Sequence, residues 1–307
     1  MLSPKASSLK KLSIVIPVVL LPLAFWLGYR ALSEHSLADI QASIIGIPNL
    51  NLALALGFVA ASYLCLTGFD ALAVRYAGRS LPYRKVALTS FVSLSIGHNV
   101  GGAAFSSGAL RYRFYSGFGL SALDVGKIIV FCGLTVTLGL ASLAGIALLL
   151  GPELGFGVVD LRPAMARFVG VLCLAAVGLY LLLAWWLKQP LVVRGHEFRM
   201  PSVRLAAGQI LVGTANFACV AAALHQLMAG AASYAQTVTA YVLGTIAGIL
   251  SHVPGGLGVL EFIIGALLGH AEAIGALIVF RVLYFFLPLL LGGTLLASTE
   301  VWRWRTR

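Results

Sequence analysis

About six apolar stretches in this sequence are long enough to cross a lipid bilayer. They cover about residues 12–32, 51–74, 128–150, 163–187, 205–229 and 273–299, and a transmembrane helix needs about 20 residues. Only 10% of the residues are charged and 60% are hydrophobic, whereas about 25% of the residues of a soluble domain are charged. A soluble protein could not solvate its surface with so few charges. The sequence therefore predicts an all-α, polytopic integral membrane protein.

The distribution of charge predicts the cellular location. The chain has 21 Lys and Arg against 10 Asp and Glu, and most of the basic residues lie in short segments between apolar stretches. This bias is typical of the cytoplasmic loops of an inner-membrane protein, so a nucleic-acid partner is not expected. The run 12–32 follows Lys5, Lys10 and Lys11 and is longer than a signal-peptide core, so we expect a retained first helix. Both termini are predicted to be cytoplasmic in a bacterial plasma membrane.

Two further apolar stretches are interrupted. Residues 86–110 contain Gly97-His98-Asn99-Val100-Gly101-Gly102, and residues 236–270 contain Ser251-His252-Val253-Pro254-Gly255-Gly256. If both stretches crossed the membrane, the later Lys- and Arg-rich loops would fall outside, against the positive-inside rule. If instead each dips in and returns, from opposite sides, the loops at 75–85, 111–127 and 188–204 and the C-terminal tail all fall inside. The charges therefore predict two re-entrant helical hairpins.

The re-entrant arrangement contains an inverted repeat. Residues about 51–150 are predicted to form a span, a hairpin and a second span, and residues about 205–299 repeat this order. The first copy starts outside the membrane and the second starts inside it. One offset matches His98 with His252, Gly101-Gly102 with Gly255-Gly256, and Lys127 with Arg281. We expect a single transmembrane domain over 1–307. Inverted repeats that meet at broken helices are typical of secondary transporters, with the binding site near the middle of the membrane.

The glycine breaks are candidate site elements. Irregular backbone at membrane depth is tolerated only where protein or a water-filled cavity covers it. The N-terminus of the half-helix after each break presents unsatisfied N–H groups, which favours an anion site. The alternative is that the glycines only allow close helix packing. The predicted structural breaks are Gly101, Gly102, Pro254, Gly255, Gly256 and Gly258.

Charged and polar residues near the breaks are the candidate ligands. Glu261 and Arg281 are intramembrane charges, so each should face the interior with a partner. They form either a structural salt bridge or a head-group site in which Glu261 orients Arg281, and both roles are compatible. His98 and His252 are either structural residues or ligands and proton carriers. No metal motif is present, and no cofactor is expected.

Two arginines follow the first hairpin. Arg111 and Arg113 are either positive-inside anchors or phosphate ligands, since a guanidinium suits bidentate binding of oxyanions. For the other charges we expect local pairing, of Asp70 with Arg75 and of Asp124 with Lys127.

These motifs together resemble one known family. Gly97-His-Asn-x-Gly-Gly102, Arg111-Tyr-Arg-x-Tyr115, Pro254-Gly-Gly-x-Gly-x-x-Glu261 and Arg281-x-x-Tyr284-x-x-x-Pro288 are similar to the lysylphosphatidylglycerol synthetase transmembrane-region family. In multiple peptide resistance factors this flippase-like domain is fused to a cytosolic aminoacyl-transferase. The given sequence ends at Arg307 without that domain, so the resemblance implies a standalone member that does not synthesise the lipid.

The resemblance implies a protein, not an enzyme, that moves an anionic or aminoacylated phospholipid between leaflets. It places Arg111, Arg113, Glu261, Arg281 and Tyr284 at the lipid head group. Two alternatives remain at this point. One is a non-transporting membrane partner of a lipid-modifying or glycan-modifying enzyme, and the other is a transporter of small soluble anions.

Overall fold

The computed structural model describes residues 38, 45–100, 103–150, 163–189, 191–193, 196–251, 253–268 and 270–305. The predicted helix 12–32 and the predicted site residues Gly101, Gly102 and His252 lie outside this part of the chain. Within it, five helical segments are long and apolar enough to cross a membrane. They are α3 (Asn49–Tyr76), α6 (Ala122–Leu150), α7 (Pro163–Trp186), α8 (Val203–Leu227) and the segment Gly275–Val301.

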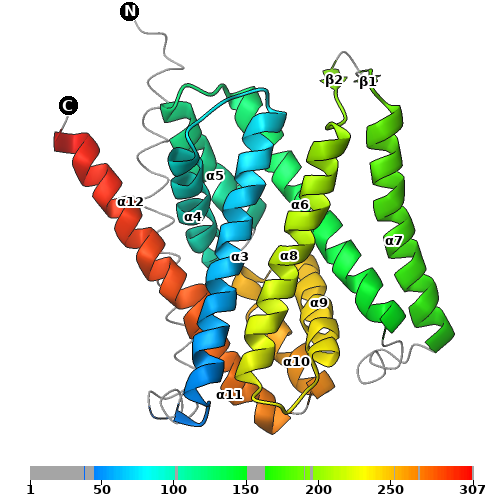
Figure 1. Cartoon of the computed structure of the whole chain (residues 1–307). Helices are drawn as coiled ribbons and strands as arrows, with labels where there is room; N and C mark the ends of the chain where they lie inside the picture. The colour runs from blue at the N-terminus through cyan, green and yellow to red at the C-terminus, as the bar shows by residue number, and fades with distance from the viewer. Residues whose placement is uncertain are drawn as a thin grey trace, which may run out of the picture.

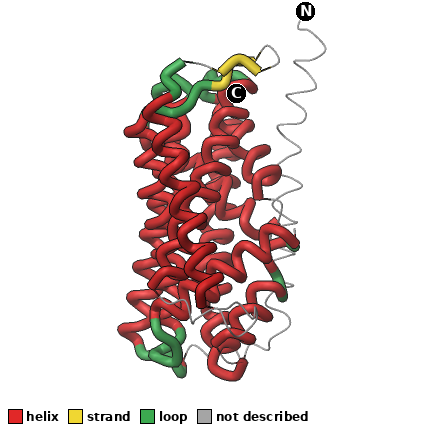
Figure 2. Tube along the Cα trace, turned by 90° about the vertical axis from the view of Figure 1, so that its right-hand side faces the viewer, coloured by secondary structure: helices red, strands yellow, loops and turns green. Residues whose placement is uncertain are grey.

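The helices stand side by side along the long axis of the molecule (Figure 2). A short antiparallel hairpin of β1 (Leu191–Val193) and β2 (His196–Phe198) joins α7 to α8, with Leu191 opposite Phe198. The sequence did not predict these strands, but they lie in a loop and leave the all-α class intact. They mark one end of the bundle, which we call the strand end, and the loop 228–233 lies at the opposite end (Figure 1).

Local capping sets where several helices begin. The α6 N-terminus carries a reciprocal capping box, in which the Ser121 amide donates to Asp124 Oδ2 (3.0 Å) and the Asp124 amide donates to Ser121 Oγ (3.2 Å). The start of α9 (Tyr234–Ser251) repeats this with Ser233 and Gln236. Each box satisfies amide N–H groups that have no partner within the helix. This capping explains why α6 begins six residues before the apolar run that predicted it.

Both interrupted stretches are helical hairpins. In the first, α4 (Tyr83–Val100) runs from the strand end into the bundle and α5 (Ala103–Gly117) returns to that end. In the second, α9 enters from the opposite end, a 3₁₀ turn η2 (Pro254–Gly256) follows, and α10 (Val259–Leu268) returns (Figure 1). The tip of α4 packs against η2, so the two hairpins meet inside the bundle. The fold is an inverted repeat with two re-entrant hairpins.

The seam between the repeats lies along α3 and α8, which run in opposite directions (Figure 1). Ser62 Oγ on α3 donates to Asn216 Oδ1 on α8 at 2.7 Å, and these residues are 154 positions apart. The same offset relates Asn49 to Val203, the first residues of the two helices. Residues related by a two-fold repeat can touch only near its axis. The Ser62–Asn216 bond therefore marks the axis of the inverted repeat.

Glycines bring neighbouring helices close together. A Cβ added to Gly139 on α6 would overlap the backbone of Gly213 on α8, and a Cβ on Gly170 of α7 would lie 3.1 Å from the Gly145 carbonyl of α6. Small residues at such crossings are characteristic of membrane bundles, where dispersion contacts and not water exclusion hold helices together.

The last span is interrupted where the sequence predicted a continuous helix over 273–299. After α11 (His270–Phe280), residues Arg281–Phe286 form a π-helical segment, η3, before α12 (Leu287–Arg305). Pro288 lacks an N–H group to donate to the Tyr284 carbonyl four residues earlier. Tyr63 Oη on α3 donates to that carbonyl instead, at 3.2 Å. π-Helical turns inside α-helices frequently occur at functional sites.

Candidate functional site

The candidate site is built where the second hairpin breaks. Gly255 and Gly256 both have φ of +61° and Gly258 has φ of +77°, a left-handed conformation that glycine adopts without steric cost. A Cβ on Gly255 would also lie 3.6 Å from the His98 carbonyl at the tip of the first hairpin. The predicted glycines of this break, Gly255, Gly256 and Gly258, are thus required by backbone conformation, and the two hairpin tips come into van der Waals contact beside Gly255.

Arg281 holds this break together. Its Nη1 donates to the Gly255 carbonyl (2.7 Å) and its Nη2 to the Gly256 carbonyl (3.3 Å). The guanidinium carbon lies 4.9 Å from the centroid of the Phe285 ring, a cation–π arrangement. The residue is only 6% exposed, so its charge must be compensated locally.

Glu261 supplies that compensation. Its Oε1 accepts from Arg281 Nε at 2.6 Å, and its Oε2 accepts from the Gly258 amide at 3.0 Å. The predicted Glu261–Arg281 salt bridge is therefore present. The carboxylate also caps the N-terminus of α10, where a negative charge is favourable. The positive end of α10, predicted to attract an anion, is met by a carboxylate of the same helix in this structure.

Aromatic residues surround the ion pair. Tyr284 stacks with Phe280 at 5.3 Å between ring centroids, and its ring lies 6.2 Å from that of His98. His98 Nδ1 is buried and has no hydrogen-bond partner among the described residues. Asn99 Nδ2 donates to the Phe285 carbonyl at 3.3 Å, which ties the first hairpin to η3. The predicted residues His98, Glu261, Arg281 and Tyr284 therefore gather where the hairpins meet.

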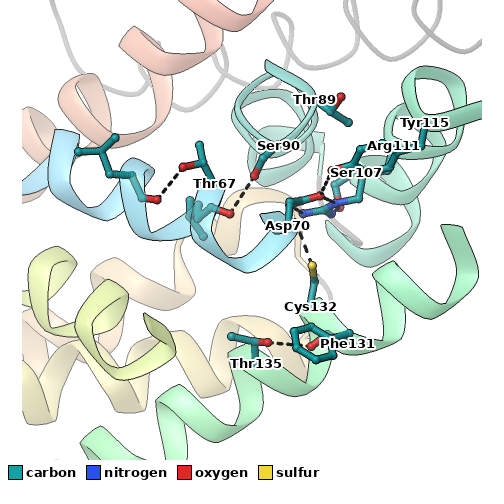
Figure 3. A network of polar contacts seen from close by, with 12 residues as sticks. Thr67, Asp70, Thr89, Ser90, Ser107, Arg111, Tyr115, Phe131, Cys132 and Thr135 are labelled. Atoms are coloured by element: carbon teal, nitrogen blue, oxygen red, sulfur yellow. Dashed lines mark hydrogen bonds and ion pairs between the residues drawn. The ribbon is translucent and has the colours of Figure 1, made fainter. Parts of the chain in front are cut away.

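Arg111 belongs to a second buried cluster, shown in Figure 3. Its Nε and Nη2 donate to the two oxygens of Asp70 on α3, and its Nη1 donates to Ser107 Oγ at 3.0 Å. Tyr115 Oη donates to Asp70 Oδ1 at 2.8 Å, and Cys132 Sγ on α6 lies 4.0 Å from Oδ2. The prediction that Asp70 pairs locally with Arg75 is wrong, because Asp70 faces the bundle interior and is fully buried.

Two further ion pairs among the described residues lie towards the strand end. Arg113 pairs with Glu300 on α12, and Arg79 Nη2 lies 2.9 Å from Asp124 Oδ2. The predicted Asp124–Lys127 pair is therefore wrong, because the capping geometry of α6 turns Asp124 towards the loop after α3. The guanidinium groups of Arg111 and Arg113 are engaged by Asp70 and Glu300. Their role as head-group ligands stays a prediction.

One pocket of about 370 Å³ lies apart from these clusters and was not predicted. It is formed by α3, α8 and the start of α9, and its lining includes Phe58, Cys219, His225 and Tyr234. His225 Nδ1 is buried and has no hydrogen-bond partner within the described part of the chain. The small side chains at positions 218, 219 and 222 leave space for this pocket on the surface of α8. Their spacing places them on one face of the helix, and this pattern is the sequence feature that could have predicted the pocket. No group of three or more His, Cys, Asp or Glu that could hold a metal ion occurs among the described residues.

Comparison with known proteins places the chain among inner-membrane proteins. No family model matches it. It is 32% identical over 266 residues to the uncharacterized protein slr0712 of Synechocystis sp., an alignment covering 84% of this chain and 82% of that protein. It is also 32% identical over 254 residues to the inner membrane protein YbhN of Escherichia coli, covering 78% of this chain and 76% of YbhN. The chain is therefore a multi-pass inner-membrane protein that belongs to the family of YbhN and slr0712.

Proposed function

We propose that this protein is a flippase-like transporter that moves an anionic or modified phospholipid between the leaflets of the inner membrane. One observation carries the proposal: two hairpins that enter from opposite ends of the bundle meet beside a buried arginine, Arg281. Secondary transporters bind their substrates at this kind of junction between inverted repeats. The resemblance of the sequence motifs to the lysylphosphatidylglycerol synthetase transmembrane-region family supports a lipid as the substrate.

In this mechanism the head group binds at the junction while the acyl chains stay in the bilayer. The guanidinium of Arg281 binds the lipid phosphate, for which its planar donors are suited. His98 and Tyr284 lie beside it and are the remaining candidate ligands at the junction. One repeat rocks against the other about the α3–α8 seam and passes the head group across. The strand end, with its basic loops, faces the cytoplasm. This mechanism requires no nucleotide, metal or catalytic residue.

A second function is favoured by one observation. The carboxylates of Asp70, Glu261 and Glu300 already pair with Arg111, Arg281 and Arg113 inside the protein. A non-transporting partner of a lipid-modifying enzyme would need these charges for folding alone. For such a partner, substitutions at Arg281 would reduce stability without changing lipid binding, and function would depend on the cytoplasmic loops.

The decisive experiment identifies lipids that co-purify with the protein by native mass spectrometry. We expect the wild-type protein to retain an anionic or aminoacylated phospholipid and Arg281→Ala to lose it. Arg79→Ala is the matched control, because it removes an arginine from an ion pair that is half exposed at the strand end. Equal lipid retention by Arg281→Ala and the wild-type protein would favour the partner function. Binding of inorganic phosphate instead of a lipid would indicate a transporter of small soluble anions.

A further inference from the structure

Two ion pairs inside the described part of the bundle, Asp70–Arg111 and Glu261–Arg281, differ in how tightly they are held. In the Asp70–Arg111 pair the side chains are 0% and 4% exposed, whereas in the Glu261–Arg281 pair they are 33% and 7% exposed. Asp70 receives two N–H groups from Arg111 and the hydroxyl of Tyr115. Glu261 receives a single N–H group from Arg281. Asp70 is enclosed on all sides, while Glu261 is partly open and held to its arginine at one point.

Arg281 has partners other than Glu261 that hold it in position. Its two terminal nitrogens donate to the carbonyls of Gly255 and Gly256, and its guanidinium lies against Phe285. These three partners carry no net charge. If the Glu261 carboxylate left, the guanidinium would stay in place with an uncompensated positive charge. A buried, positioned and uncompensated guanidinium is a strong binding group for a phosphate.

We propose that Glu261 is the built-in competitor of the transported lipid phosphate and that its protonation opens the site. This inference rests on the proposed function of the junction. When Glu261 takes up a proton from water, the neutral acid no longer compensates Arg281, and the phosphodiester of an anionic lipid replaces it. When the lipid leaves, Glu261 returns its proton to water and pairs with Arg281 again. One proton is bound for each lipid phosphate bound.

The titration of other groups near the junction must be distinguished from that of Glu261. Arg281 and Tyr284 face the junction from η3, α9 contributes Tyr241, and α4 contributes His98 through its contact with η2. On α11, His270 and Glu272 lie in the first turn, at the far end of α10 from Glu261. His98 and His270 both ordinarily titrate near neutral pH, so the experiment must distinguish them from Glu261.

The experiment measures binding of phosphatidylglycerol to the purified protein between about pH 5.5 and pH 7.5. For the wild-type protein we expect affinity to rise as pH falls, by up to about tenfold per pH unit, the limit for one linked proton. Glu261→Gln should bind with high affinity throughout this range and show no pH dependence. Its amide oxygen can still accept from the Gly258 amide, so the cap of α10 is kept. Asp124→Asn, which changes the carboxylate of another arginine pair, should behave as the wild-type protein does.

Each outcome has a distinct meaning. A pH dependence that persists in Glu261→Gln would overturn the proposal and assign the proton to His98 or another group. Weaker lipid binding by a folded Glu261→Gln would also overturn it. A wild-type protein that binds neither phosphatidylglycerol nor its aminoacylated form at any pH would contradict the proposed function itself. Inorganic phosphate in the same titration separates a free anion from a lipid head group.

A second measurement needs no variant. Calorimetric titration of the wild-type protein with phosphatidylglycerol, in two buffers of different ionisation enthalpy, reports the protons bound per lipid. We expect uptake of up to one proton per lipid near neutral pH. Binding without proton uptake across the range would overturn the exchange at Glu261, even if Glu261→Gln does not fold.

Discussion

The carboxylate of Asp70 and the guanidinium of Arg111 form a two-point ion pair inside the bundle. Arg111 Nε lies 2.9 Å from Asp70 Oδ1, and Nη2 lies 2.7 Å from Oδ2. The pair joins α3 of the first repeat to the outgoing helix of its hairpin (Figure 3). Both oxygens of the carboxylate are used, which fixes the rotation of α5 against α3. This cluster positions the first hairpin against the rest of the bundle.

Asp70→Asn should therefore destabilise the protein strongly. Removing one member of a buried ion pair leaves an uncompensated charge and typically costs about 3–5 kcal/mol. Thermal unfolding in detergent, followed for the wild-type and variant proteins, measures the effect. Asp124→Asn is the matched control, because its partner Arg79 is 50% exposed and such pairs contribute about 0–1 kcal/mol. Similar losses in the two variants would contradict the structural role of Asp70.

The crossing of α6 and α8 gives a second prediction. Gly139→Ala places a methyl group against the backbone of Gly213, which cannot move without separating the helices. We expect a loss of about 1–3 kcal/mol or more, the usual cost of overpacking. Gly133→Ala is the matched control, because Gly133 lies on the same helix and a Cβ added there meets nothing within 4 Å. That control should be neutral or stabilising by up to about 1 kcal/mol, because alanine is the better helix former. Unfolding temperatures of the two variants test this difference, and equal temperatures would contradict the close crossing.

The seam between the repeats gives a third prediction. The side chains of Cys65 on α3 and Cys219 on α8 lie close enough to interact across this seam. Like Ser62 and Asn216, these cysteines are related by the repeat offset and lie across its axis. Mild oxidation with copper–phenanthroline should therefore form an intramolecular disulfide, seen as the loss of two hydrogens in the intact mass. Reduction should reverse it. If the repeats rock at this seam, the disulfide should inhibit lipid translocation until it is reduced.

Two single variants control this experiment. Cys65→Ser should not form the cross-link, whereas Cys173→Ser, which changes a residue on α7, should still form it. A folded wild-type protein that resists cross-linking would show that α3 and α8 meet in another register.

Much of the architecture could be predicted from the sequence because the bilayer restricts it. The length of apolar stretches sets the spans, and the position of basic loops distinguishes a crossing from a re-entrant hairpin. The matched His-x-x-Gly-Gly segments indicated the inverted repeat. Glu261 and Arg281 were expected to pair because both stand alone among apolar residues, and an isolated charge at that depth needs a partner.

The partners of the other charges depended on the tertiary structure. Asp70 is 41 residues from Arg111, and Arg113 is 187 residues from Glu300. Which residues meet across such distances depends on how each helix is rotated about its axis. In a soluble helix the apolar face indicates that rotation, but a membrane helix is apolar on all sides and carries little such signal. Composition and charge therefore determined how the chain crosses the membrane, whereas helix packing decided which charges pair and where the π-helical break places Arg281.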